Sequence, residues 1–215
     1  MPNLLYIDTS ASKATVAFSQ EGKTVAIRMH DNANEQAAVL NIMINNVLEE
    51  ASNTLDNVDA LCVCAGPGSY TGLRVGLSTA KGIAYVKDIP LMLFNRLDLI
   101  AWEQNKKEPF AIALKARNGE YFFATYTDKG AQSNPPQHLF EQDLAPYVSQ
   151  DLLFITDDVD FSVSQHKETI DANHTLDMNS WIANAEERFR LKQFDDLAYS
   201  EPFYLKSAYT TQSKK

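Results

Sequence analysis

One glycine-rich stretch decides the fold, Ala65-Gly66-Pro67-Gly68-Ser69-Tyr70-Thr71-Gly72-Leu73-Arg74-Val75-Gly76. It joins an apolar run, 61–65, to a helical pattern, 73–86. Glycine permits tight turns and close approach of another backbone, and Ser69 or Thr71 is placed to cap the helix. A strand, a glycine loop and a capped helix are typical of an anion or phosphate cradle. A tight turn that binds nothing is an equally good interpretation, because the lysine of a P-loop is absent.

The composition is that of an acidic globular protein. The 215 residues, 45% of them hydrophobic, suffice for one large domain or two small lobes. A net charge of −9 argues against unaided binding of nucleic acid, although a partner could supply the basic surface that such binding requires. Cys62 and Cys64 share one face of an expected strand, which favours buried free thiols. With no leader or membrane span visible, we expect a cytoplasmic protein.

Hydrophobic periodicity predicts a β-β-β-α-β-α-β-α order for the first half of the chain. The expected strands are 4–7, 14–18, 24–27, 61–65 and 90–94, and the expected helices are 35–51, 73–86 and one beginning at 97.

The second half is predicted to be a shorter version of the first. Its expected elements are a hairpin of 110–114 and 121–126, a loop at 133–136, a strand at 152–155, a solvated segment at 157–160, a helix capped by Asn179, a terminal strand at 202–205 and a frayed end at 210–215.

The expected helices 35–51 and 73–86 carry apolar and polar side chains outside the faces that would pack on a core. Ala80, together with glycines 72 and 76, forms a row of small residues that permits close packing, within this chain or across an interface. The alternative is that both helices pack only on their own sheet and leave scattered apolar residues exposed. The partner interface that we predict comprises Val39, Ile42, Met43, Asn46, Arg74, Leu77, Ser78 and Lys81.

Several motifs together resemble those of the TsaB (YeaZ) family. They are Leu5-Tyr6-Ile7-Asp8-Thr9-Ser10, the loop from Gly66 to Arg74, Ala116-Arg117-Asn118-Gly119-Glu120-Tyr121, which is similar to "DAR-x-GEVY", and Glu201-Pro202-Phe203-Tyr204-Leu205, which is similar to "EPxYLR". The resemblance implies an α/β, two-lobed actin-like ATPase (ASKHA) fold with ribonuclease-H-like lobes. We expect an N-terminal lobe over 1–100 and a reduced C-terminal lobe over 101–215.

The resemblance also implies a function. TsaB-type proteins resemble scaffold subunits that pair with the TsaD enzyme and, with the ATPase TsaE, support threonylcarbamoyl transfer to adenosine in tRNA. We therefore expect a non-catalytic accessory subunit of a threonylcarbamoyltransferase complex. It would be a homodimer when alone and would reach tRNA only through the complex. It would have no cofactor of its own, and any ATP or ADP with Mg²⁺ would lie at the partner interface.

The alternative is a small Mg-dependent ATPase or kinase of the actin-like fold that acts alone. In ATPases of this fold an aspartate that ends the first strand coordinates Mg²⁺ through water, and hydroxyls that follow it face phosphate. The residues that this role would require here are Asp8, Thr9, Ser10, Gly66, Gly68 and Ser69. Asp8 could instead cap its own turn.

The metal and catalytic chemistry of TsaD is not expected in this chain. TsaD-type enzymes hold a metal with H-x-x-x-H on the first long helix, whereas 32–38 here contains no histidine. His30, His138, His166 and His174 have no ligand spacing, and no histidine lies near Ser69 in the sequence to act as a base. Lys115 stands where the family hairpin has aspartate, and 154–159 lacks the glycine pair of a second phosphate loop. We predict neither a metal site nor a catalytic residue, and find no protease triad.

Overall fold

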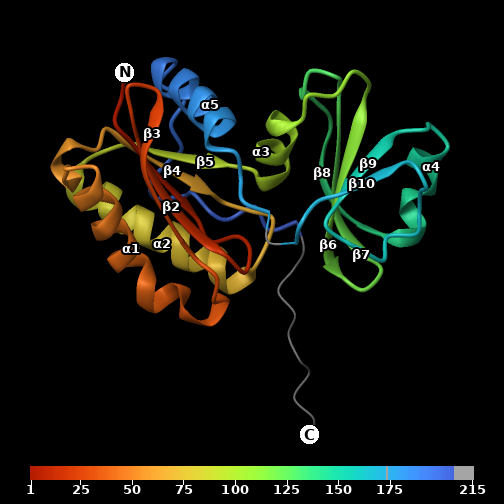
Figure 1. Ribbon diagram of the computed structural model, residues 1–215, viewed down its shortest axis with the longest axis horizontal. Coiled ribbons are helices and arrows are strands. Elements are labelled where there is room, and N and C mark those ends of the chain that lie inside the picture. The colour runs from red at the N-terminus through yellow and green to blue at the C-terminus, as the bar shows by residue number, and fades with distance from the viewer. Residues whose placement is uncertain (173, 206–215) are drawn as a thin grey trace, which may run out of the picture.

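The structure, a computed structural model, describes residues 1–172 and 174–205, so the predicted frayed end at 210–215 lies outside the described residues. Two five-stranded sheets stand side by side and each carries its own helices (Figure 1). Among the described residues, no helix combines the length and the apolar character that crossing a membrane requires.

The first sheet has the strand order β3-β2-β1-β4-β5, in which β1, β2 and β3 are antiparallel and β4 and β5 run parallel to β1. Its elements are β1 (Leu4–Asp8), β2 (Ala14–Gln20), β3 (Lys23–His30), η1 (Ala33–Glu35), α1 (Gln36–Glu50), η2 (Leu55–Asn57), β4 (Ala60–Cys64), α2 (Tyr70–Lys87), β5 (Leu91–Phe94) and α3 (Arg96–Glu103). The predicted order of elements in the first half is therefore confirmed.

The second sheet repeats this topology in the order β8-β7-β6-β9-β10. Its elements are β6 (Phe110–Arg117), β7 (Glu120–Tyr126), β8 (Gln132–Phe140), η3 (Glu141–Leu144), α4 (Ala145–Val148), β9 (Leu153–Thr156) and β10 (Lys167–Thr169), and α5 (Met178–Arg190) follows them. The repeat is reduced, because one turn of 3-10 helix and the four-residue α4 stand where the first lobe has α1.

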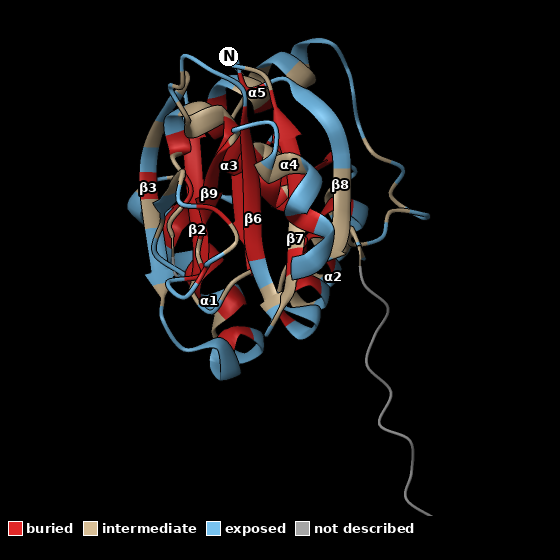
Figure 2. Cartoon of the chain, turned by 90° about the vertical axis from the view of Figure 1, so that its right-hand side faces the viewer, coloured by how far each residue is buried: buried red, intermediate tan, exposed pale blue. Residues whose placement is uncertain are grey.

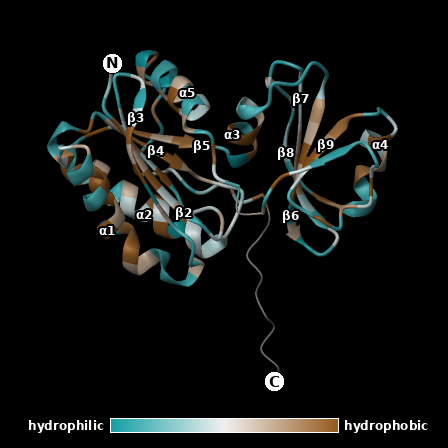
Figure 3. Ribbon diagram, in the orientation of Figure 1, coloured by the Kyte–Doolittle hydropathy of each residue, from teal (hydrophilic) through white to brown (hydrophobic). Residues whose placement is uncertain are grey.

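Apolar packing orders the molecule into layers. Helices α1 and α2 cover the outer face of the first sheet, and α3 and α5 cover its inner face. The inner core continues to the second sheet through Phe110, Ile112 and Tyr126. Apolar residues line both sheets in Figure 3, and β6 is the buried central strand of the second sheet in Figure 2. Cys62 and Cys64 are free thiols in the inner core, as predicted.

The predicted loop at 133–136 is wrong, because these residues belong to β8. Pro135 and Pro136 lack N–H groups, but within the described part of the chain β8 pairs with β7 alone and lies at the edge of the sheet, where proline is tolerated. The cap of α5 is Asp177, which accepts the Ser180 N–H at 2.9 Å, and not Asn179.

The end of the described chain also differs from prediction. No strand forms at 202–205, where Phe203 instead donates one backbone hydrogen bond to the Ala65 carbonyl. Trp181 of α5 packs edge-on against Tyr6 and Phe94 of the first sheet. The expected boundary at residue 100 therefore does not separate the lobes completely, since α5 returns to the first one.

Candidate functional site

A cleft of about 590 Å³ opens between the lobes. The first lobe contributes the turn after β1 and the glycine loop before α2, and the second lobe contributes the end of β6. Polar and charged residues that line it include Ser10, Ser69, Arg96, Lys115, Arg117 and Asp157. Of the sequence-predicted nucleotide residues, Ser10, Gly68 and Ser69 line the cleft, whereas Asp8, Thr9 and Gly66 are buried and do not line it.

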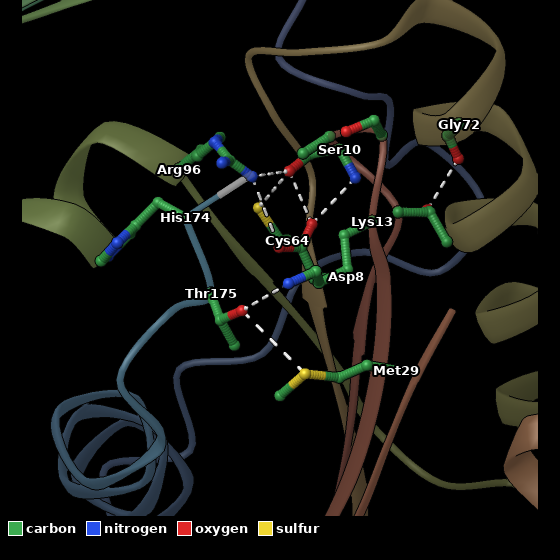
Figure 4. Close-up of polar contacts among 12 residues, drawn as sticks. Asp8, Ser10, Lys13, Met29, Cys64, Gly72, Arg96, His174 and Thr175 are labelled. Carbon is green, nitrogen blue, oxygen red and sulfur yellow. Dashed lines mark hydrogen bonds and ion pairs between the residues drawn. The ribbon is translucent and has the colours of Figure 1, made fainter. Parts of the chain in front are cut away.

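Asp8 is already bonded within the chain (Figure 4). It is 5% exposed, and its Oδ1 accepts the Ser10 N–H at 2.8 Å and the Ser10 hydroxyl at 2.6 Å. The buried Arg96 guanidinium lies 3.5 Å from Oδ2 and donates to Ser10 Oγ at 2.7 Å. Cys64 Sγ donates to the same hydroxyl oxygen at 3.3 Å. An internal cation thus neutralises the carboxylate that an ATPase would use for Mg²⁺.

The glycines of the loop face this chain's own backbone. A Cβ added at Gly68 would lie 2.1 Å from the Ser10 carbonyl oxygen, and one at Gly72 would lie 2.0 Å from the Thr9 carbonyl oxygen. Thr9 Oγ1 also donates to the Gly72 carbonyl at 2.7 Å, and the Ser69 N–H donates to the Ser10 carbonyl at 2.7 Å. The close packing that we predicted for this row occurs within the chain, where Gly72, together with Gly76 and Ala80, is buried.

The capping function predicted for Ser69 is confirmed, since its hydroxyl accepts the Gly72 N–H at 3.2 Å. Gly66 is buried, and its carbonyl accepts the Arg96 N–H at 2.7 Å. The Asp8 oxygens and the glycine surfaces therefore have partners that Mg²⁺ and phosphate would have to displace. These residues do not fit a Mg-nucleotide in this chain alone.

Lys115 and Asp157 in the second-lobe wall of the cleft belong to an ion cluster whose aspartates were expected in solvent. Asp158 is buried, with Lys115 Nζ at 2.8 Å and the Tyr121 hydroxyl at 2.8 Å. Burial raises the pKa of Asp158, but the bonds from Lys115 and Tyr121 outweigh it and hold that pKa below its usual value. Lys115, the residue that departs from the family hairpin, thus pairs with a neighbouring carboxylate.

The repeated topology identifies the second-lobe counterpart of the turn after β1. It is the turn between β6 and β7, which follows Lys115 and Arg117, whereas the stretch 154–159, in which we looked for the glycine pair of a second phosphate loop, includes the end of β9, the counterpart of β4. Asp157 lines the cleft from the end of β9 and accepts the Lys115 N–H at 2.6 Å. Burial raises the pKa of Asp157.

The four histidines lie apart from one another and each contacts a carboxylate. The partners are Glu35 for His30 at 3.0 Å, Glu120 for His138 at 2.8 Å, Glu108 and Asp151 for His166 at 3.8 and 3.6 Å, and Glu103 for His174 at 2.5 Å. Within residues 1–172 and 174–205, no three His, Cys, Asp or Glu side chains are grouped so that they could hold a metal ion.

The predicted partner interface is partly wrong. Met43 and Leu77 are buried in the outer core of the first lobe, because they lie on the sheet side of α1 and α2, and Val39 packs at the edge of that core. Ile42 is 59% exposed, and Asn46, like Arg74 and Ser78, is also exposed. Tyr85 and Val86, at the end of α2, are 79% and 77% exposed and were not in the predicted set.

Sequence reasoning also missed what lies over α2. A segment that we call the strap, residues 195–205, crosses from the edge of β5 to the cleft, and Asp195 Oδ2 accepts the Leu93 N–H at 2.7 Å. Arg74 donates to the Tyr204 hydroxyl at 3.0 Å, and its guanidinium carbon lies 4.1 Å from the centre of the Tyr70 ring. The only signal in the sequence was the tyrosine in the terminal motif.

Arg96 is a further residue that the sequence analysis did not single out. It is the first residue of α3, and Asn95 caps that helix by accepting the Leu97 N–H at 2.9 Å. A lone arginine two residues after the end of a buried strand was the available signal, because such a strand end faces the cleft.

The comparisons with known proteins agree with this architecture. The model of the family "TsaD: tRNA N6-adenosine threonylcarbamoyltransferase" matches residues 30–138. The protein named "tRNA threonylcarbamoyladenosine biosynthesis protein TsaB" is 31% identical over 134 residues in Haemophilus influenzae and 30% identical over 126 residues in Escherichia coli. These matches cover 61% and 57% of this chain. They span 56% and 54% of the two relatives, which is little more than half of their length.

Two solved structures share the fold. A Pseudomonas aeruginosa protein described as similar to peptidase YeaZ superposes with a TM-score of 0.81 at 22% identity, over 96% of this chain and 100% of that one. YeaZ from the same organism gives a TM-score of 0.77 at 22% identity, over 95% and 100%. The two-lobed ASKHA-type fold that the sequence motifs led us to expect is thereby confirmed. The chain belongs to the family whose model is described as "TsaD: tRNA N6-adenosine threonylcarbamoyltransferase", and it is a TsaB-type member of that family.

Proposed function

We propose that this chain is a non-catalytic subunit that pairs with a TsaD-type enzyme in the synthesis of threonylcarbamoyladenosine in tRNA. One observation carries the proposal, the exposed apolar side chains on the outer face of α1 and α2. Ile42, Tyr85 and Val86 are more than half exposed, on helices whose opposite sides are fully used by the core. Large apolar side chains that stay exposed on helices already packed on a core favour a protein partner. The names of the TsaB relatives support the choice of pathway.

The cleft supports a role outside the chemistry. Asp8 is paired with Arg96, and the glycine loop is filled by the backbone of residues 9 and 10, so an ATPase or kinase acting alone is not favoured. A net charge of −9 opposes direct binding of tRNA. We propose that tRNA is reached only through the complex, and that ATP or ADP with Mg²⁺, where the complex uses it, is held at the interface between subunits.

The same proposal covers the other components. A TsaE-type ATPase would join the pair, and the exposed face of α1 and α2 would form a homodimer when the enzyme partner is absent. A role in tRNA modification would place the protein in the cytoplasm.

Co-purification with the TsaD-type protein of the same genome tests the proposal. We expect the wild-type chain to bring the enzyme down and Ile42→Asp to lose it, because the substitution places a charge in an apolar contact. Val159→Asp is the matched control, since Val159 is 76% exposed on the second lobe, far from α1 in the fold. Retention of the enzyme by Ile42→Asp, or loss by both variants, would contradict this interface.

A cellular measurement tests the pathway itself. Deletion of this chain should abolish or strongly reduce threonylcarbamoyladenosine in total tRNA, measured by mass spectrometry of nucleosides. Full modification in the deletion strain would reject the proposed function.

A further inference from the structure

The outer face of the first lobe carries a groove between α2 and the strap, with a volume of about 800 Å³. Its walls include Tyr70, Arg74, Ser78 and Lys81 from α2 and Glu201 and Tyr204 from the strap. The groove adjoins the α1–α2 face of the proposed interface, because α1 and α2 pack against each other (Figure 1). It is distinct from the inter-lobe cleft, although Tyr70 and Tyr204 border both.

The groove holds two cations without acidic partners. Among the described residues, no carboxylate lies within 4.0 Å of the Arg74 or Lys81 nitrogens, although the chain carries 28 acidic residues. Some other cations do have such partners, and Lys87, which lies on the same helix as Arg74 and Lys81, pairs with Asp56 of η2. Glu201 also lies in the wall of the groove but not within 4.0 Å of either cation, so the lining has two cations against one carboxylate.

Neutral groups hold both cations in place. Arg74 is fixed by the Tyr204 hydroxyl and the face of the Tyr70 ring. Lys81 Nζ donates to the carbonyls of Ala198 at 3.1 Å and Ser200 at 3.0 Å. These contacts order the side chains and leave their charge intact. Ordering before binding lowers the entropic cost of an ion pair, and a guanidinium matches a carboxylate with two parallel hydrogen bonds.

The spacing of the two cations constrains their ligand. They are seven residues apart on α2, which brings them to nearly the same side of the helix about 10 Å apart along its axis. Two carboxylates with the same separation occur on a helix at positions i and i+7. Charge complementarity thus selects an acidic helix whose carboxylates lie two turns apart.

We propose that this groove binds an acidic helical segment of the partner protein, with one carboxylate on Arg74 and a second at Lys81. The inference rests on the proposed function, because the TsaD-type enzyme is the protein that would present the segment. It assigns to the groove an electrostatic part of the interface, beside the apolar part centred on Ile42. The contact fixes orientation and speeds encounter as well as adding affinity.

The test measures binding of the full-length chain to the TsaD-type enzyme by biolayer interferometry at several NaCl concentrations. We expect Arg74→Gln and Lys81→Gln each to weaken binding about tenfold and to reduce its dependence on salt. The matched control is Arg190→Gln, because Arg190 is an exposed arginine of α5 that pairs with Glu187. This control should bind like the wild type.

Two further variants separate charge from strap structure. Tyr204→Phe removes the hydroxyl that accepts from Arg74 but keeps the cation, so it should bind within about twofold of wild type. Arg74→Lys keeps the charge and should retain more binding than Arg74→Gln. If Tyr204→Phe and Arg74→Lys both bind as weakly as Arg74→Gln, displacement of the strap explains the loss and the inference is overturned.

The outcomes distinguish the two proposals. Absence of binding by the wild-type chain rejects the proposed function and the groove with it. Wild-type binding that Arg74→Gln and Lys81→Gln leave unchanged, with the same salt dependence, rejects the groove alone. If the two variants weaken only self-association, measured by sedimentation, the occupant is a second copy of this chain and the inference is wrong.

Discussion

Replacement of Arg96 by methionine removes the cation from the buried cluster at the base of the cleft. Asp8 and Arg96 are both about 5% exposed. Because methionine approximates the volume of the arginine stem, a cavity adds little to the loss of stability. The Asp8 carboxylate would keep its two bonds from Ser10 but lose the guanidinium 3.5 Å away. A buried charge that has lost its partner costs about 3–5 kcal/mol in the free energy of unfolding.

Urea unfolding followed by circular dichroism measures this loss. With an m-value of about 3 kcal/mol/M, the midpoint should fall by about 1–2 M. The double variant Asp8→Asn/Arg96→Met removes both charges while an amide oxygen still accepts from Ser10. We expect it to be more stable than Arg96→Met alone by about 2 kcal/mol. A double variant as unstable as Arg96→Met, or less stable, would refute the view that Arg96 acts as the counter-charge of Asp8.

Two further predictions concern packing and pH. Gly72→Ala should lower the free energy of unfolding by about 1–3 kcal/mol or more, because the new Cβ would lie 2.0 Å from the Thr9 carbonyl oxygen. The same urea assay measures this change. Unchanged stability would contradict the prediction and would show that α2 moves away from Thr9 without cost. The pKa of Asp158 is lowered in the folded state, so its ionised carboxylate stabilises the fold. This contribution to the free energy of unfolding is complete above the pKa of an unfolded aspartate, about 4, and is lost as the pH falls below that value. Lys115→Ala should weaken this acid dependence of the melting temperature between about pH 4 and 2, and an identical dependence in both proteins would contradict the assignment.

The sequence predicted the first lobe well because its signals are local. Turn residues separate its strands, the helices show clear periodicity, and Ser69 caps α2 as expected. The face of a helix was harder to assign. Met43 and Leu77 were expected at an interface, whereas the sheet beneath α1 and α2 is wide enough to bury them. Periodicity fixes which residues share a face, but the width of the surface that covers it is a tertiary property.

The candidate site was predictable in its membership but not in its bonding. The motifs brought Asp8 and the glycine loop together, yet nothing local pairs Asp8 with Arg96, which lies 88 residues away in sequence. Asp158 was expected in solvent because it stands in an acidic run, and Lys115, 43 residues earlier, supplies the cation that permits its burial. Such long-range pairs are decided by topology, which a single sequence expresses only weakly.

The return of α5 to the first sheet has a consequence for synthesis on the ribosome. Tyr6 and Phe94 are made early, but Trp181, which covers them, is made only after the whole second lobe. A domain that emerges first usually folds first, whereas here the inner surface of the first sheet must stay open to solvent or to a chaperone until α5 has left the exit tunnel. Released chains that end before residue 178 should therefore carry an exposed apolar surface, and released chains that include α5 should not.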